Sequence, residues 1–86
     1  MRSFCFDSSN IAWGKNDQEN CFFISMMISH IKDILRYRGY VYLNDIYELF
    51  NVTWNPDDEN ICYKDPRTFF IDVESDDNGG YLIKVD

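Results

Sequence analysis

The side chains that could take part in catalysis are few and widely spaced along the chain. There is one histidine, His30, and there are three cysteines, Cys5, Cys21 and Cys62. His30 with Cys21 would supply a base and a nucleophile, but an imidazole on the flank of an expected helix more often has a structural role. The chain has no glycine-rich phosphate loop and no G-x-S-x-G turn. We therefore expect a binding protein and not an enzyme.

Carboxylates are the most abundant reactive groups, with fifteen Asp and Glu among 86 residues. Acid–base pairs could form among them, but at this density some carboxylates lie close together by chance. Segments 57–60 and 76–78 offer hard oxygen ligands, yet neither has the spaced ligands, central glycine and closing glutamate of a calcium loop. We expect both segments to be solvated loops, with no metal ion and no cofactor.

The negative charge is concentrated in the second half of the chain. Residues 1–43 carry five Lys/Arg and four Asp/Glu, a net charge of +1, whereas residues 44–86 carry three and eleven, a net charge of −8. Such a potential repels nucleic acid and speeds encounter with a basic protein surface. Charge of this kind also keeps a small, aromatic-rich protein in solution, and composition leaves both roles open.

Two surfaces are candidate partner interfaces. Carboxylates on loops and on the outward face of a hairpin can imitate phosphates and enter a groove built for nucleic acid. A segment rich in Tyr and Arg, at the junction of two expected helices, has the composition of an interface hot spot. The acidic candidates are Asp57, Asp58, Glu59, Asp72, Glu74, Asp76 and Asp77, and the tyrosine candidates are Tyr40 and Tyr42.

Helical and strand patterns along the chain predict an α+β fold. Asn16 or Asp17 can cap an amphipathic helix that runs to about Arg38 and ends at Gly39, with apolar residues at three- and four-residue spacing. Asn44 can cap a shorter helix from Asp45 to Phe50. We expect strands at 2–6, 40–43, 68–74 and 81–85, and an exposed loop at 55–60.

The expected architecture is one long amphipathic helix and a short second helix packed on a small antiparallel sheet with a C-terminal β-hairpin. The length predicts a single domain, 1–86. No apolar run approaches the span of a bilayer, and the first residues lack the apolar stretch of a signal peptide, so we expect a cytoplasmic protein without membrane contact. The three cysteines are then expected to be reduced and mostly buried.

The stretch from Arg38 to Phe50 carries a Gly-x-Val-x-x-Asn-Asp-x-Tyr core after a helix and before a Trp54-containing segment. It resembles a pattern in small uncharacterised proteins of bacteriophages and mobile elements of Firmicutes. The resemblance covers about half the chain and transfers no catalytic residue. Small acidic phage proteins of this kind include inhibitors of host defence, among them anti-CRISPR proteins that resemble nucleic acid in charge.

The resemblance implies an inhibitor in the cytoplasm of the bacterial host. It would bind a nucleic-acid-handling defence protein with a basic surface, such as a CRISPR effector, through the acidic second half of the chain. The alternative is a phage accessory or assembly protein that acts through protein–protein contact or self-association at the tyrosine-rich helix junction. The protein itself is expected to be a monomer or a homodimer. A DNA-binding regulator is disfavoured because the expected helix at 45–50 carries Asp45 and Glu48 and no basic residue.

Overall fold

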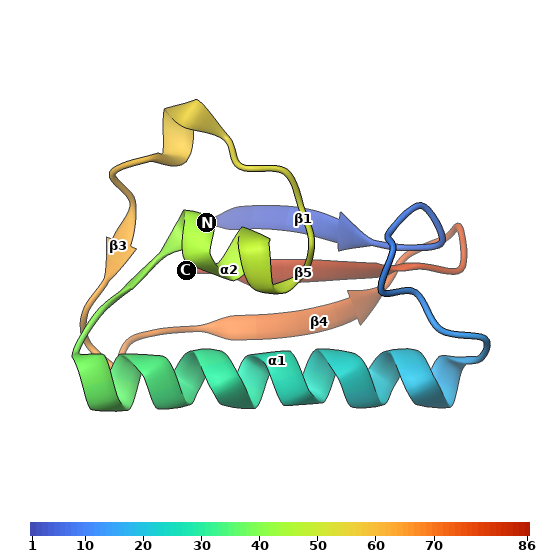
Figure 1. The fold of residues 1–86 in the computed structure, drawn as a ribbon, viewed down its shortest axis with the longest axis horizontal. Helices are drawn as coiled ribbons and strands as arrows, with labels where there is room; N and C mark the ends of the chain where they lie inside the picture. Colours follow the sequence, from blue (N-terminus) through green and yellow to red (C-terminus); the bar gives the residue numbers. More distant parts are fainter.

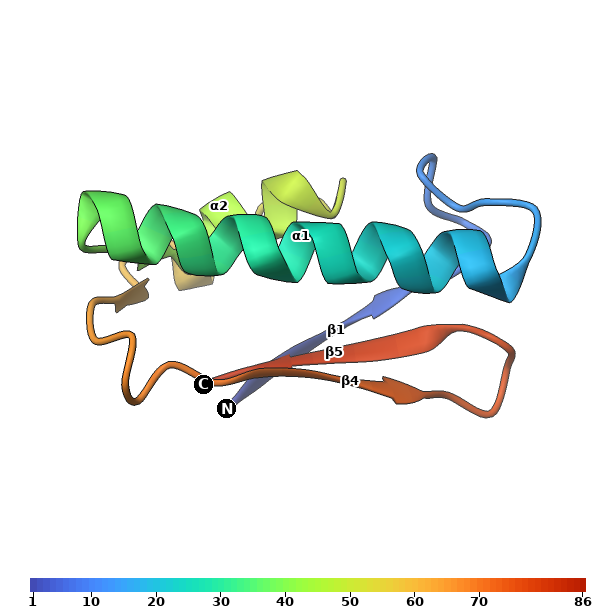
Figure 2. The same cartoon turned by 90° about the horizontal axis from the view of Figure 1, so that it is seen from below.

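The computed structural model describes residues 1–86 and has two layers, with both helices on one face of a three-stranded antiparallel sheet (Figures 1 and 2). The strand order in that sheet is β1-β5-β4, and β2 and β3 form a separate two-stranded sheet. The prediction of an α+β fold is confirmed. The elements are β1 (Arg2–Phe6), α1 (Asp17–Arg38), β2 (Val41–Tyr42), α2 (Leu43–Leu49), the 3-10 turn η1 (Pro56–Asp58), β3 (Cys62–Tyr63), β4 (Ile71–Ser75) and β5 (Tyr81–Val85).

Helix α1 begins and ends where the sequence predicts. The Asn16 side chain accepts a hydrogen bond from the backbone N–H of Glu19 at 2.9 Å, which satisfies one of the free donors of the first turn. Gly39 has a φ of 86°, in the left-handed region, and its N–H donates to the carbonyl of Leu35. These two local devices fix the helix at both ends.

Helix α2 begins at Leu43, two residues before the predicted start, and Asn44 does not cap it. The carboxylate of Asp45 instead accepts the backbone N–H of Tyr42 at 3.1 Å. Asn44 lies inside the helix and is buried, and its side chain exchanges two hydrogen bonds with the backbone of Asn55, at 3.3 and 3.4 Å. The asparagine therefore anchors the segment that follows α2.

The core lies between the sheet and the helices. Phe4, Ile83 and Val73 are neighbours across the three strands and face this layer. The ring of Phe6 stacks on Phe23 from α1 with 5.2 Å between centroids. One cluster of thirteen buried residues results: Phe4, Phe6, Ile24, Ile31, Leu35, Val41, Leu43, Ile46, Tyr47, Phe50, Tyr81, Ile83 and Val85.

The first strand of the hairpin, β4, is shorter than the alternating pattern at 68–74 predicts. Residues 65–69 form a turn in which the N–H of Phe69 donates to the carbonyl of Asp65 at 2.9 Å, so β4 begins at Ile71 instead of Thr68. Strand β5 keeps its predicted bounds, and its alternate residues Tyr81, Ile83 and Val85 are buried as expected. Neither helix combines the length and the apolar content that a bilayer crossing requires.

Candidate functional site

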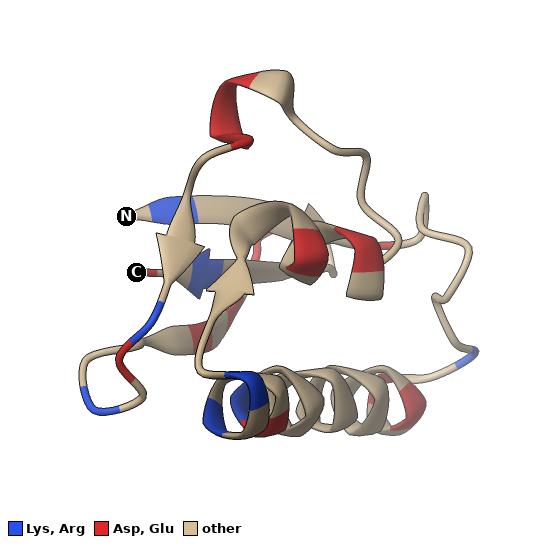
Figure 3. Ribbon diagram, turned by 60° about the vertical axis from the view of Figure 1, so that its left-hand side comes forward, with Lys and Arg blue, Asp and Glu red and all other residues tan.

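The predicted acidic residues do not form one continuous surface. Asp57 and Glu59 are exposed at η1, whereas Asp72 and Glu74 are exposed on β4 and Asp77 lies in the turn after it. Figure 3 shows the acidic segments distributed over η1, α2 and β4. Strands β5 and β1 separate β4 from the η1 side of the molecule (Figure 1). A run of carboxylates along one face, as phosphate mimicry requires, is therefore divided into two groups.

Asp58 is not an exposed loop residue, which corrects the prediction for segment 55–60. Its side chain is only 2% exposed, and Oδ2 accepts a hydrogen bond from the hydroxyl of Tyr47 at 3.0 Å. Oδ1 lies 3.3 Å from a guanidinium nitrogen of Arg2, an ion pair whose geometry falls outside that of a hydrogen bond. The carboxylate thus ties η1 to β1 and α2. It serves the fold and is not available to a partner.

Two more of the predicted acidic residues are engaged within the hairpin. Glu74 forms an ion pair with Lys84 on the neighbouring strand. The carboxylate of Asp76 accepts the backbone N–H groups of Asn78 and Gly80, both at 2.8 Å, and so closes the turn. Asp76 therefore shapes the hairpin, while Asp72 and Asp77 remain exposed without such contacts.

The tyrosine candidates lie beside an acidic hollow at the junction of α1, β2 and α2. Tyr40 and Tyr42 meet edge to face with 5.8 Å between ring centroids, and both are partly exposed. A hollow of about 310 Å³ next to them is lined by Tyr42, Asn44, Asp45, Trp54, Glu59 and Asn60. We call Tyr40, Tyr42, Asp45, Trp54 and Glu59 the junction surface.

Local contacts hold the helix-junction part of this surface, Tyr40 and Asp45, in place. The guanidinium of Arg38 lies 4.4 Å from the ring centroid of Tyr40 and donates to the carboxylate of Asp45 at 3.0 Å. Because Arg38 is in the last turn of α1 and Asp45 in the first turn of α2, this contact connects the two helices. Tyr40 and, through it, Tyr42 are therefore held in place, which lowers the entropic cost of ordering these two rings on binding.

Trp54 was not among the residues predicted for the site. Its side chain is 57% exposed, although tryptophan is among the most buried side chains on average. A tryptophan between Thr53 and Asn55-Pro56, in a segment without hydrophobic periodicity, is the sequence signal that could have identified it. The sequence pattern likewise assigns Asp45 to a helix and predicts no site role for it.

The possible nucleophile and base of the sequence are far apart. Cys21 and His30 are nine positions apart on α1, about two and a half turns, so the two side chains point to opposite sides of the helix. The Cys21 thiol lies 3.5 Å from the hydroxyl of Tyr81, while His30 lines a groove on the outer side of α1. Cys5 and Cys21 are exposed and Cys62 is half-buried, so the prediction of mostly buried thiols is wrong.

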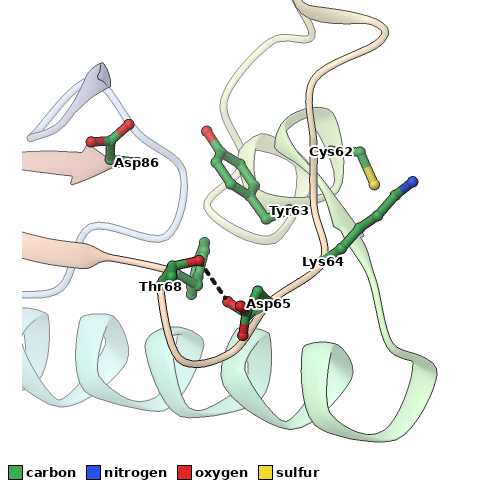
Figure 4. A pocket seen from close by; sticks show the side chains of 7 residues that line it. Cys62, Tyr63, Lys64, Asp65, Thr68 and Asp86 are labelled. Atoms are coloured by element: carbon green, nitrogen blue, oxygen red, sulfur yellow. Dashed lines mark hydrogen bonds between the residues drawn. The ribbon is translucent and has the colours of Figure 1, made fainter.

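The largest hollow, of about 460 Å³, lies where β3 and the following turn approach the C-terminus (Figure 4). In it the hydroxyl of Thr68 donates to the backbone carbonyl of Asp65 at 3.4 Å, and the Asp65 carboxylate is occupied by Arg67. These contacts shape the turn and align no nucleophile with a base. The lining residues are Cys62, Tyr63, Lys64, Asp65, Thr68, Phe69 and Asp86, and no group of three or more His, Cys, Asp or Glu in the structure is placed to hold a metal ion.

Tyr47 makes stability sensitive to alkaline pH. Burial, then the hydrogen bond to Asp58 and its negative charge, raise the pKa of Tyr47 from 10.0 to about 12. Because the folded pKa exceeds the unfolded one, the stabilisation is fully present below pH 10 and is lost as the pH rises towards 12. We expect the melting temperature to fall across this window, measured by circular dichroism.

The Tyr47→Phe variant is the control for this alkaline loss. It cannot ionise at that position, so its melting temperature should fall less between pH 10 and 12, although it starts lower because the hydrogen bond to Asp58 is gone. If the melting temperatures of the wild-type protein and the variant fell in parallel with pH, the loss would not come from Tyr47.

No protein-family model matches this chain, and no curated protein or solved structure shows significant similarity to it.

Proposed function

We propose that the protein binds and inhibits a nucleic-acid-handling host-defence protein that presents a basic surface, and that it does so through the junction surface. The observation that carries this proposal is the exposure of Trp54 and Tyr42 around a hollow that also contains the carboxylates of Asp45 and Glu59. A CRISPR effector is the first partner to test.

The aromatic part of the junction surface supports a protein partner. Trp and Tyr are the residue types most enriched at interface hot spots, since each buries a large area while losing few rotamers. Trp54 is 57% exposed and Tyr42 is 41% exposed, and both line the same hollow. An inserted side chain of the partner would cover both rings at once.

The charge around the rings supports a basic partner. Glu59 lines the hollow without an ion pair, whereas Oδ2 of Asp45 is held by Arg38. Asp57 is exposed on η1, and the protein has a net charge of −7. A negative surface of this kind attracts the Lys and Arg residues with which a nucleic-acid-binding protein holds phosphates. We therefore expect binding to weaken as salt is raised.

Binding of the immobilised protein to purified, guide-loaded CRISPR effectors tests the proposal, with affinity measured at low and high salt. We expect Trp54→Ala and Tyr42→Ala each to weaken binding by about tenfold or more. Asp77→Asn, in the hairpin turn away from the junction, is the matched control and should bind like the wild-type protein. If only Asp77→Asn lost binding, the interface would lie on the hairpin instead, and its carboxylates would act as the phosphate mimic.

The alternative function, an accessory or assembly protein that self-associates, is favoured by a different observation. The outer side of α1 exposes Phe22 and Met26, which no other element covers. Association through apolar side chains depends less on salt than the capture of a basic partner does. Binding of no effector at any salt concentration, together with self-association, would favour this alternative.

A further inference from the structure

The outer side of α1 is an uncovered face that the proposed interface does not use. All other elements lie to one side of this helix in Figure 1, and the sheet lies beneath it in Figure 2. Phe22 is 67% exposed and Met26 is 50% exposed. A shallow groove of about 400 Å³ runs along this side and is lined by Phe22, Ser25, Met26, Ser29, His30 and Asp33.

The spacing of residues on this face is that of a helix–helix seam. Positions 19, 22, 26, 29, 33 and 36 alternate three and four residues apart, which keeps them on one side of a helix. The buried residues Ile24, Ile31 and Leu35 lie on the opposite side and pack on the core. Helix α1 therefore has two seams, and only one of them is occupied within the chain.

The charges at the two ends of α1 select the occupant of the outer seam. On this face Glu19 lies in the first turn and Arg36 in the last turn. The neighbouring charges Asp17 and Arg38 point inward instead, where they contact Tyr81 and Asp45. Figure 3 shows the basic end of the helix towards the viewer and the acidic end away. A second α1 in antiparallel orientation places acidic ends against basic ends, whereas a parallel pair places like charges together.

We propose that a second copy of this chain docks on this face, with the two α1 helices antiparallel about a two-fold axis. In the register that sets Met26 opposite Ser29 of the second copy, Glu19 lies opposite Arg36, and two-fold symmetry repeats both contacts. The small side chains of Ser25 and Ser29 let the helices approach closely, so that Met26 can pack between them.

Asp33 limits the strength of this pairing. In the same register it faces Phe22 of the second copy, and its carboxylate is otherwise balanced only by Arg36 of its own helix, at 3.7 Å. Each copy also carries a net charge of −7, which opposes association. The dimer is therefore reversible and depends on concentration.

Sedimentation equilibrium over a range of protein concentrations tests the proposal. We expect the mass of the wild-type protein to rise from 10.3 kDa towards twice that value as the concentration increases. The Phe22→Ser variant should remain monomeric, whereas Trp54→Ala, on the junction surface, should associate like the wild-type protein. A wild-type protein that stays monomeric at every concentration overturns the proposal, as does a Phe22→Ser variant that dimerises normally.

A charge-reversal pair tests the orientation and register. Glu19→Arg and Arg36→Glu should each weaken dimerisation, because each sets two like-charged pairs across the seam. Glu19→Arg also removes the acceptor of the Lys15 N–H, so its fold is checked first. Mixing the two variants should restore association as a heterodimer. One cross-seam pair then joins the two substituted side chains, which have opposite charges, and the other pair joins the remaining native Arg36 and Glu19. Failure of the mixture to associate, while circular dichroism shows both variants folded, rejects the antiparallel register.

Discussion

Replacing Asp58 by alanine is expected to destabilise the protein by about 2–4 kcal/mol. The substitution leaves the hydroxyl of Tyr47 without its acceptor, and Tyr47 is only 6% exposed. It also removes the ion pair that joins η1 to Arg2. Arg2 is half exposed and can turn to water, so most of the loss comes from the buried hydroxyl and the released turn. Urea unfolding followed by circular dichroism measures the change.

Graded substitutions separate the parts of this effect. Asp58→Asn keeps an acceptor for Tyr47 and loses only the charge towards Arg2, so its destabilisation should be smaller than that of Asp58→Ala. Asp57→Ala changes an exposed neighbour and should stay within about 0.5 kcal/mol of the wild-type protein. Equal stability of Asp57→Ala and Asp58→Ala would mean that Asp58 faces solvent after all.

The same contacts explain which parts of the fold the sequence predicts. Helix α1 is set by groups within a few residues of its ends, Asn16 and Gly39, and by an apolar period along its own length. Such local signals can be recognised in the sequence without knowledge of the fold. Strand β5 is predictable for the same reason, because its alternation lies within five residues.

The burial of Asp58 depends on partners far away in the sequence. Tyr47 is eleven residues distant, and Arg2 comes from the first strand. In the sequence Asp58 is one of three consecutive acidic residues in a polar segment, a composition typical of an exposed loop. Asn44 is similar: its position favours a helix cap, but a nonlocal pair of hydrogen bonds with Asn55 determines its role.

The junction surface was only partly predictable. Tyr40 and Tyr42 are close in sequence, so a local pattern identifies them, whereas Trp54 and Glu59 reach the same hollow only because the segment after α2 folds back over it. That return is fixed by the Asn44–Asn55 hydrogen bonds and by the Asp58 contacts. Asn44 and Asp58, whose roles the sequence does not predict correctly, therefore position Trp54 and Glu59 beside the tyrosines.

Replacing Ile31 by alanine should destabilise the protein by about 2–5 kcal/mol, since the substitution opens a cavity in the middle of the core. Ile31 is fully buried on the inner side of α1 and belongs to the cluster that joins the helices to the sheet. A domain of this size has roughly 4–13 kcal/mol of total stability, so the loss is a large fraction of it. The shift in the urea midpoint, at unchanged slope, measures the effect.

Lys32→Ala is the matched control for Ile31→Ala, because it changes the next residue on the same helix, where the side chain is exposed. Its effect should stay within about 0.5 kcal/mol. A much larger loss of stability in Ile31→Ala than in Lys32→Ala would show which side of α1 faces the core. It would also show that Phe22 and Met26 point outward. Equal effects would mean that the helix is rotated about its axis, and both the buried core and the exposed dimer seam would then have to be reassigned.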